Sequence, residues 1–207
     1  MTATLNRQRK QTAQSRTTSH LPWTQAQSLL KCLTADNQHN TALMCAAGLY
    51  FGLRIGDILQ LRWKDILQPS FTIHEQKTGK RRKIKVHPDF ALIRDAALQQ
   101  MPEHRRPQPQ QFVFVSQEPR GNRRRPISRQ AANKRFKKAL QAYGIETANP
   151  SSHTLRKTFG RRVWNKNGKS EAALVLLGEI FNHRSITVTR KYLGITADEI
   201  AQAYLSL

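Results

Sequence analysis

The stretch from Asn40 to Tyr50 constrains the fold most strongly, because a helix of this composition is apolar on most of its faces. Its apolar residues include Leu43, Met44, Cys45, Ala46, Ala47 and Leu49. Other elements must surround such a helix to keep these side chains from water. The sequence therefore predicts a central buried helix that ends near Gly52, a residue suited to a left-handed helix stop.

The flanking segments predict elements that can surround this helix. Thr24 has capping-box spacing to Gln27 ahead of a run of leucines, which predicts a helix starting near Thr24. Helical spacing of apolar residues predicts a second, short helix starting beside Arg54. Residues 71–74 and 83–86 alternate with period two around a basic turn, which predicts a β-hairpin.

The remaining segments predict a mainly helical α+β domain with a small antiparallel sheet. Residues 112–115 (FVFV) predict a further short strand, and the Pro/Gln-rich residues 102–111 predict a loop. Helices are predicted at 88–99, 128–143, 152–166, 170–181 and 185–193, followed by a tail helix at 198–207 with Asp198 as its N-cap. We expect one large core in a domain spanning 21–207, and a basic, disordered arm at 1–20.

Positive charge is gathered in three segments of the chain. The 207 residues include 35 Lys or Arg and 13 Asp or Glu, a formal net charge of +22. Residues 1–20, Lys77–Lys85 and Arg120–Lys138 contain no acidic residue. A nucleic acid, an anionic membrane or an acidic protein would each match this charge. Three unbalanced runs favour a phosphate-binding surface over solubility alone.

Several classes of protein are disfavoured by the sequence. No stretch approaches the roughly 20 apolar residues of a membrane span, and the N-terminus lacks the apolar region of a secretory signal. We therefore expect a cytoplasmic protein with no membrane contact. Cys32 and Cys45 lie in apolar, helix-like stretches without metal-ligand spacing, so we interpret both as core thiols and expect no metal site.

Two segments carry side chains suited to phosphate chemistry. Ser151 is a predicted N-cap, and His153 and Arg156 follow three residues apart on one face of the first turns, where the helix dipole favours anions. His183 lies between two predicted helices, and Tyr192 follows nine residues later. Each feature alone is common in ordinary surfaces and cores, so these residues gain weight only as a joint pattern.

That joint pattern consists of four sequence blocks in a fixed order. They are GLYFGLRIGDILQLRWKDI (48–66), EQKTGK (75–80), SHTLRKTF (152–159) and FNHRSITVTRKYLGI (181–195). Together they resemble the tyrosine recombinase (phage integrase) family over about residues 40–196. Many members have Leu-Gly before the second histidine, where this chain has Phe181-Asn182. Because Asn also adopts the left-handed helix end, we expect the geometry to be kept.

The resemblance implies a site that cuts DNA through a 3′-phosphotyrosyl link and releases a 5′-hydroxyl. Tyr192 matches the nucleophile. Arg54 and Arg156 match the two arginines whose planar forks bind non-bridging phosphate oxygens. Asp57 falls where the family has an acidic residue, and we expect it to hold the Arg54 guanidinium in place.

The same resemblance implies groups that move protons and bind the phosphate. Lys77 matches the lysine that protonates the leaving 5′ oxygen, and Lys80 is the alternative. His153 matches a position used for proton transfer, and His183 a position that hydrogen-bonds the scissile phosphate. We expect further DNA contacts from Lys80, Arg81, Arg82, Lys83, Arg123, Arg124, Arg125, Lys134 and Arg135.

The activity that the resemblance implies is site-specific DNA recombination without a metal, nucleotide or other cofactor. Its expected partners are double-stranded DNA, further copies of the chain in a tetramer on DNA, and accessory DNA-bending proteins. The resemblance implies that the tail helix docks on a neighbouring copy, and the alternative is that it packs on its own domain. Relatives often carry a separate DNA-clamping domain ahead of the matched region, so the alternatives are a minimal recombinase and a catalytic fragment. Relaxation of DNA as by a type IB topoisomerase, and an inactive DNA-binding regulator, are the competing functions.

Overall fold

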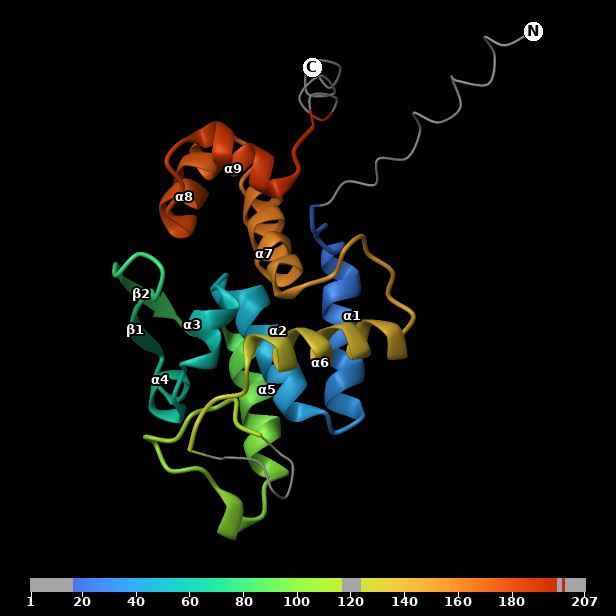
Figure 1. Cartoon of the computed structure of the whole chain (residues 1–207), viewed down its shortest axis with the longest axis vertical. Coiled ribbons are helices and arrows are strands. Elements are labelled where there is room, and N and C mark those ends of the chain that lie inside the picture. Colours follow the sequence, from blue (N-terminus) through green and yellow to red (C-terminus); the bar gives the residue numbers. More distant parts are fainter. Residues whose placement is uncertain (1–16, 117–123, 197–198, 200–207) are drawn as a thin grey trace, which may run out of the picture.

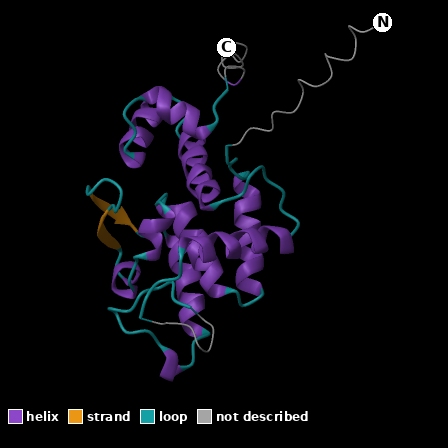
Figure 2. Cartoon of the chain, viewed as in Figure 1, coloured by secondary structure: helices purple, strands orange, loops and turns teal. Residues whose placement is uncertain are grey.

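The computed structural model of the chain describes residues 17–116, 124–196 and 199 (Figures 1 and 2). In chain order its elements are α1 (Trp23–Ala35), α2 (His39–Phe51), α3 (Ile55–Leu59), α4 (Trp63–Leu67), β1 (Ser70–His74), β2 (Arg81–Lys85), α5 (Pro88–Gln99), a 3-10 turn (Glu103–Arg105), α6 (Arg129–Ala142), α7 (Ser152–Lys166), α8 (Glu171–Phe181) and α9 (Ile186–Leu193). The described sheet is the antiparallel β1–β2 hairpin. The predicted fold class is confirmed.

Helix α2 is the centre of the fold, as its composition predicts. All but its first residues and Tyr50 are buried, and α1, α5, α6 and α7 pack around it. The helix ends at Gly52, whose φ of 57° lies in the left-handed region. A Cβ at Gly52 would lie 2.4 Å from Cδ1 of Phe159, so glycine is required for both conformation and space. Two residues after this helix end, Arg54 is the N-cap of α3 and has an extended backbone conformation.

The buried apolar residues form two clusters, which corrects the expectation of one large core. The larger cluster joins α1, α2, α5, α6 and the hairpin, and the smaller joins α7, α8 and α9 around Phe181. Helix α7 contributes Leu155 to the first and Trp164 to the second. Figure 1 shows α8 and α9 beside the far half of α7, away from α5. Two packing units therefore meet along α7.

Two local predictions are wrong, the strand at 112–115 and the capping role of Thr24, and one helix was not predicted. Residues 112–115 form no strand, since the backbone makes only isolated bridges there and Val113 and Phe114 enter the main core. Helix α1 begins at Trp23 after Pro22, so Thr24 lies inside the helix and does not cap it. Helix α4 was not predicted, because five residues are too few for a periodic signal.

Both predicted terminal segments lie largely outside the described residues. Of the predicted arm, residues 17–20 are described, and the Ser19 N–H donates to the Ala148 carbonyl at 3.1 Å. Of the tail, Glu199 is described. Its side chain accepts from the Thr196 N–H and its own N–H donates to Thr196 Oγ1, both at 3.2 Å, which is capping-box geometry. Glu199 also pairs with Arg161 of α7.

Candidate active site

Arg54 enters the site from the start of α3. Its guanidinium donates to Glu75 Oε2 at 2.7 Å and to the carbonyl of Phe181, at the C-terminal end of α8, at 3.0 Å. The side chain keeps 21% of its surface exposed. Arg54 therefore links the hairpin to α8 while its side chain stays partly open to solvent.

Arg156 reaches the same point from α7 and is 2% exposed. It donates to the Gly52 carbonyl at 2.5 Å and to the Phe181 carbonyl at 3.3 Å, and its Cζ lies 4.3 Å from the centre of the Phe181 ring. These carbonyls lie at the ends of α2 and α8, where the helix dipole is negative and favours cations. Two arginines, 102 positions apart (156 − 54), thus share one carbonyl oxygen.

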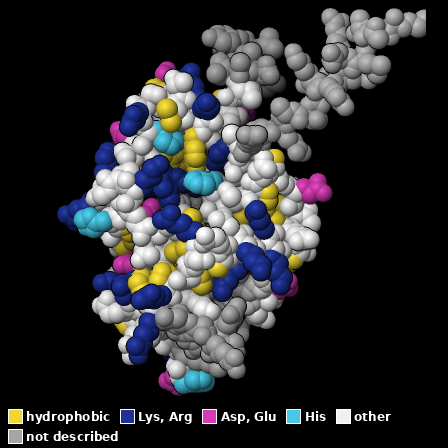
Figure 3. All heavy atoms as spheres, viewed as in Figure 1, with side chains coloured by type: hydrophobic (Ala, Val, Ile, Leu, Met, Phe, Trp, Pro, Cys, Tyr) yellow, Lys and Arg dark blue, Asp and Glu magenta, His cyan; other side chains and the backbone are white. Residues whose placement is uncertain are grey.

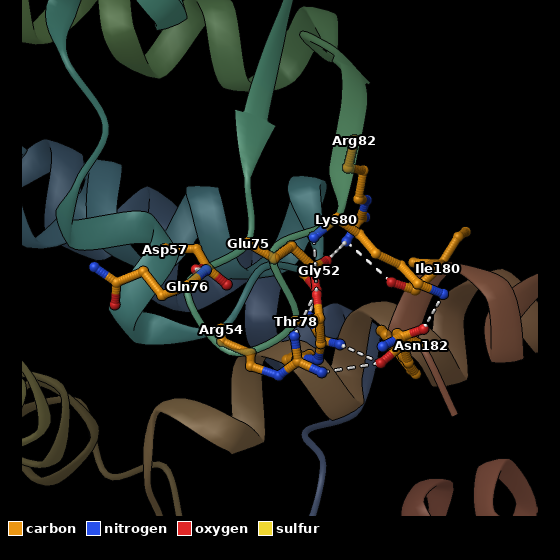
Figure 4. A network of polar contacts seen from close by, with 12 residues as sticks. Gly52, Arg54, Asp57, Glu75, Gln76, Thr78, Lys80, Arg82, Ile180 and Asn182 are labelled. Carbon is orange, nitrogen blue, oxygen red and sulfur yellow. Dashed lines mark hydrogen bonds and ion pairs between the residues drawn. The ribbon is translucent and has the colours of Figure 1, made fainter. Parts of the chain in front are cut away.

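Glu75, and not Asp57, holds Arg54. The Asp57 carboxylate instead accepts from the Gln76 N–H at 2.9 Å, which fixes the start of the hairpin turn (Figure 4). Glu75 is 3% exposed and also accepts from Thr78 Oγ1 at 3.0 Å. Although burial alone raises the pKa of Glu75, the hydrogen bonds from Arg54 and Thr78 outweigh it and lower the pKa. Glu75 is therefore a buried carboxylate that orients Arg54.

The hairpin turn separates the two lysine candidates. Lys80 donates to Asn182 Oδ1 at 2.6 Å, and Asn182 has the left-handed conformation (φ 54°) that ends α8. Lys77 is exposed and lines a pocket of about 410 Å³ together with Arg54, Arg129 and His153. A larger pocket, about 620 Å³ and lined by residues of α1, α2 and α5, contains no candidate residue.

Both histidines lie near the two arginines. Burial, then the charge of Arg156, lowers the pKa of His153 and of His183 from the ordinary value. Both imidazoles are therefore favoured in the neutral form, which can accept a proton. His183 Nδ1 lies 3.1 Å from Thr189 Oγ1 of α9, which fixes the direction of its ring.

Tyr192 packs on the residues that surround the arginines. Its ring meets those of Phe181 and His183 edge-on, with centroids 5.3 and 5.1 Å apart. Among the described residues, no group meets hydrogen-bond geometry with its buried hydroxyl. Burial raises the pKa of Tyr192, and the charges of Arg156 and Arg54 partly offset this increase. The arrangement brings together Tyr192, both arginines and both histidines.

The predicted DNA-contacting residues divide into two groups. Arg81, Lys83, Arg124, Arg125 and Lys134 are exposed, and Arg135 donates to Asn40 Oδ1 at 3.2 Å. On the face of the molecule that Figure 3 shows, Lys and Arg side chains are widespread and acidic side chains are few. The prediction that Arg82 contacts DNA is corrected by the structure. Its guanidinium donates to the Phe51 and Ile180 carbonyls and lies 3.5 Å from Glu75. Arg123 lies outside the described residues.

Sequence reasoning missed the residues that hold the site together. Glu75 stands inside the EQKTGK block, where an acid within a basic turn was an available signal. Arg129 lies in the third basic run and donates to Gln76 Oε1 at 3.1 Å. Within the described ranges, no three His, Cys, Asp or Glu side chains gather as a metal would require, and no helix is long and apolar enough to cross a membrane.

Comparisons with known proteins identify the family of this chain. The phage integrase family model matches residues 20–199. The probable integrase/recombinase YoeC of Bacillus subtilis (strain 168) is 33% identical over 159 residues, 76% of this chain and 78% of that protein.

Solved structures show the same fold. A XerA recombinase superposes with a TM-score of 0.66 at 18% identity, over 90% of this chain and 64% of that one. A lambda integrase dimer bound to a COC' core site superposes with a TM-score of 0.60 at 21% identity, over 90% of this chain and 51% of that one. The matched relatives thus range from similar length to about twice as long. The chain belongs to the phage integrase family of tyrosine recombinases, enzymes that cleave and rejoin DNA.

Proposed function

We propose that this chain is a site-specific recombinase in which Tyr192 attacks a DNA phosphodiester. The observation that carries the proposal is the convergence of Arg54 and Arg156 on the carbonyl of Phe181, whose ring also contacts Tyr192. A carbonyl oxygen is a neutral acceptor, so an anionic phosphate oxygen is a stronger partner for the same guanidinium groups. The nucleophile and the phosphate-binding cations thus share one anchor residue.

The proposed step forms one bond to phosphorus and breaks another. The Tyr192 oxygen forms a bond to phosphorus, and the bond from phosphorus to the 5′ oxygen breaks. The tyrosine proton passes to a neutral histidine, for which His153 is the candidate, while Lys77 gives a proton to the leaving oxygen. Rejoining reverses these transfers with the 5′-hydroxyl of a second strand. The phosphodiester energy is kept in the tyrosyl link, and the step requires no cofactor.

Transition-state charge is the main demand on this site. A pentacoordinate phosphorane carries more negative charge than the ground state, and fixed cations stabilise that difference. Arg156 is positioned by two backbone carbonyls, and Arg54 by Glu75 and one carbonyl. Burial lowers the pKa of Arg156 to about 10, so it stays protonated at neutral pH. We assign to His183 a hydrogen bond to the same phosphate.

Recombination also requires several copies of the enzyme. The lambda integrase structure holds a dimer on a core site. We propose that this chain likewise assembles on double-stranded DNA, as a tetramer when two sites are paired. We also propose that it acts in the cytoplasm at the nucleoid, where its DNA substrate would lie. Accessory DNA-bending proteins would then set which sites meet.

The test uses duplex DNA recovered by selection from a random pool for binding to the full chain. A nick placed near the cleavage point traps the product by letting a short strand diffuse away. Wild-type protein should form a covalent adduct that survives denaturing electrophoresis. Tyr192→Phe should bind the same duplex within about twofold and form no adduct, because only the attacking oxygen is lost.

The same duplexes separate the competing functions. Exchange of strands between two labelled duplexes supports recombination. Relaxation of a supercoiled plasmid without strand exchange would favour a topoisomerase. Binding without any adduct from the wild-type chain would favour an inactive regulator and contradict the proposal.

A further inference from the structure

Lys157 is a buried cation beside the proposed nucleophile. Lys157 is 8% exposed, and burial lowers the pKa of its ammonium group. Among the described residues, no carboxylate lies within ion-pair distance of it. Burying a charge without a counter-ion is costly, so stability of the fold does not explain a lysine here.

The ammonium of Lys157 has two contacts in the described structure. It donates to the carbonyl of Thr18 at 2.6 Å, and it lies 5.3 Å from the centre of the Tyr192 ring. A cation near the face of an aromatic ring is attracted to that ring. Lys157 therefore touches the segment that enters the domain and the side chain that carries the chemistry.

The entering segment is itself fixed to α7 and its preceding loop. The Leu21 N–H donates to Thr158 Oγ1 at 2.9 Å, and Thr18 Oγ1 lies 3.2 Å from Ser151 Oγ, the N-cap of α7. With the Ser19 bond to Ala148, residues 18–21 are held at three points besides Lys157. The position of the Lys157 ammonium is thus set by backbone that is itself anchored.

We propose that Lys157 is a positioning residue that ties residues 18–21 to the ring of Tyr192. This inference rests on Tyr192 being the nucleophile. The ring of Tyr192 is held by Phe181 and His183 at its edges, and Lys157 supplies a contact of a different kind. The Thr18 carbonyl holds the Lys157 ammonium, and the ammonium in turn contacts the Tyr192 ring, so loss of the first contact would weaken the second.

The test compares Lys157→Met with Lys157→Arg in the full chain, on the nicked duplex described above. Methionine keeps an unbranched stem of similar length and removes the charge, so folding should be kept. We expect Lys157→Met to slow single-turnover adduct formation about tenfold at saturating protein, with DNA affinity unchanged within about twofold. Lys157→Arg should keep the rate within about threefold, because it keeps a cation and several donors.

A second variant tests whether Lys157 acts through the entering segment. Thr158→Val removes the hydroxyl that anchors Leu21 while nearly matching its shape, and should slow the reaction about threefold. If both side chains act through residues 18–21, the double variant should be slowed about tenfold rather than the thirtyfold of independent effects.

Three results would overturn this inference. The first is a wild-type rate in Lys157→Met, and the second is multiplicative effects in the double variant. The third is a large loss of thermal stability in Lys157→Met that accounts for the lower rate. Tyr192→Phe serves as the separate check, since an adduct in that variant contradicts the proposed function rather than the role of Lys157.

Discussion

At the scale of single residues, the two lysines of the hairpin turn differ in their surroundings. Lys80 is hydrogen-bonded to Asn182, whereas Lys77 makes no hydrogen bond or ion pair among the described residues and lines the pocket with Arg54. We predict that Lys77→Ala slows cleavage of ordinary DNA about a hundredfold. A substrate with sulfur in place of the 5′ bridging oxygen needs little protonation, so it should restore most of that rate.

Lys80→Ala is the matched control for this prediction. It should slow both substrates equally, because it loses a contact at the end of α8 and not a proton donor. Selective rescue of Lys80→Ala by the sulfur substrate would move the general acid three residues along the turn.

Glu75 should contribute to the cleavage rate and, at neutral pH, to the free energy of unfolding. We predict that Glu75→Gln slows cleavage about tenfold, about 1.4 kcal/mol, because Arg54 loses its charged partner. The folded-state pKa of Glu75 is below the ordinary 4.5. Its contribution to stability is therefore present above pH 4.5 and is lost as the pH falls through the folded-state pKa.

Urea unfolding at several pH values measures this effect. The difference in unfolding free energy between wild type and Glu75→Gln should shrink on acidification. The exposed Glu146→Gln variant is the control and should follow wild type at every pH. A constant difference between wild type and Glu75→Gln from pH 7 to pH 3 would show that the charge of Glu75 is not involved.

The residues that bear recognisable chemistry were predictable, and those that orient them were not. Arg54, Arg156 and Tyr192 stand in sequence blocks that match the family pattern, and each side chain suits a chemical role. Glu75 and Asp57 are both acids near Arg54, and only the path of the hairpin decides which one reaches the guanidinium. Spacing in the chain favoured Asp57, three residues away, whereas the structure places Glu75 against Arg54.

At the scale of helices, close packing of α7 against α8 and α9 positions Tyr192. A Cβ at Gly160 of α7 would lie 2.5 Å from Leu193 Cδ2 and 2.9 Å from Phe181 Cε2. We predict that Gly160→Ala destabilises the domain by about 1–3 kcal/mol through overpacking. It should also lower cleavage, because Leu193 follows Tyr192 directly. Thermal unfolding and single-turnover cleavage measure the two effects.

Gly178 of α8 offers the matched control. A Cβ there meets Thr189 Oγ1 at 3.4 Å, an ordinary contact. Gly178→Ala should therefore be neutral or stabilising by up to about 1 kcal/mol, since alanine is the better helix former. Equal losses of stability in the two variants would contradict the packing account.

Long helices were predictable from the sequence because apolar periodicity and caps mark them directly. Helix α5 runs from Pro88 to Gln99 and α7 from Ser152 to Lys166, as predicted. The prediction of a strand at 112–115 was wrong because a short run of apolar residues is expected both in a buried strand and in a buried irregular segment. Val113 and Phe114 are core side chains on irregular backbone, which periodicity cannot distinguish from a buried strand.

At the scale of the whole molecule, binding should depend strongly on salt. Contacts to about 6–10 phosphates predict a slope of log K against log salt between about −5 and −9. Lys83→Gln removes one exposed cation from the hairpin and should make the slope shallower by about 1. Lys31→Gln, on α1 and outside the basic runs, should leave it unchanged. Titrations at several salt concentrations test this, and a wild-type slope shallower than about −2 would contradict it.

The division into two packing units explains where the site lies. Arg54, Glu75 and Lys77 belong to the unit built around α2, whereas His183 and Tyr192 belong to the unit of α8 and α9. Their contacts cross between the units at the C-terminal end of α8. This arrangement could not be predicted from the sequence, because both units have similar helical patterns and only their packing separates them.

The central claim is that Tyr192 carries the cleaved DNA strand. Its most direct test is mass spectrometry of the covalent adduct after digestion with trypsin and nuclease. The peptide containing Tyr192 should gain the mass of a nucleotide joined through its 3′ phosphate. The same mass on another residue, such as Tyr204, or attachment through a 5′ phosphate, would contradict it.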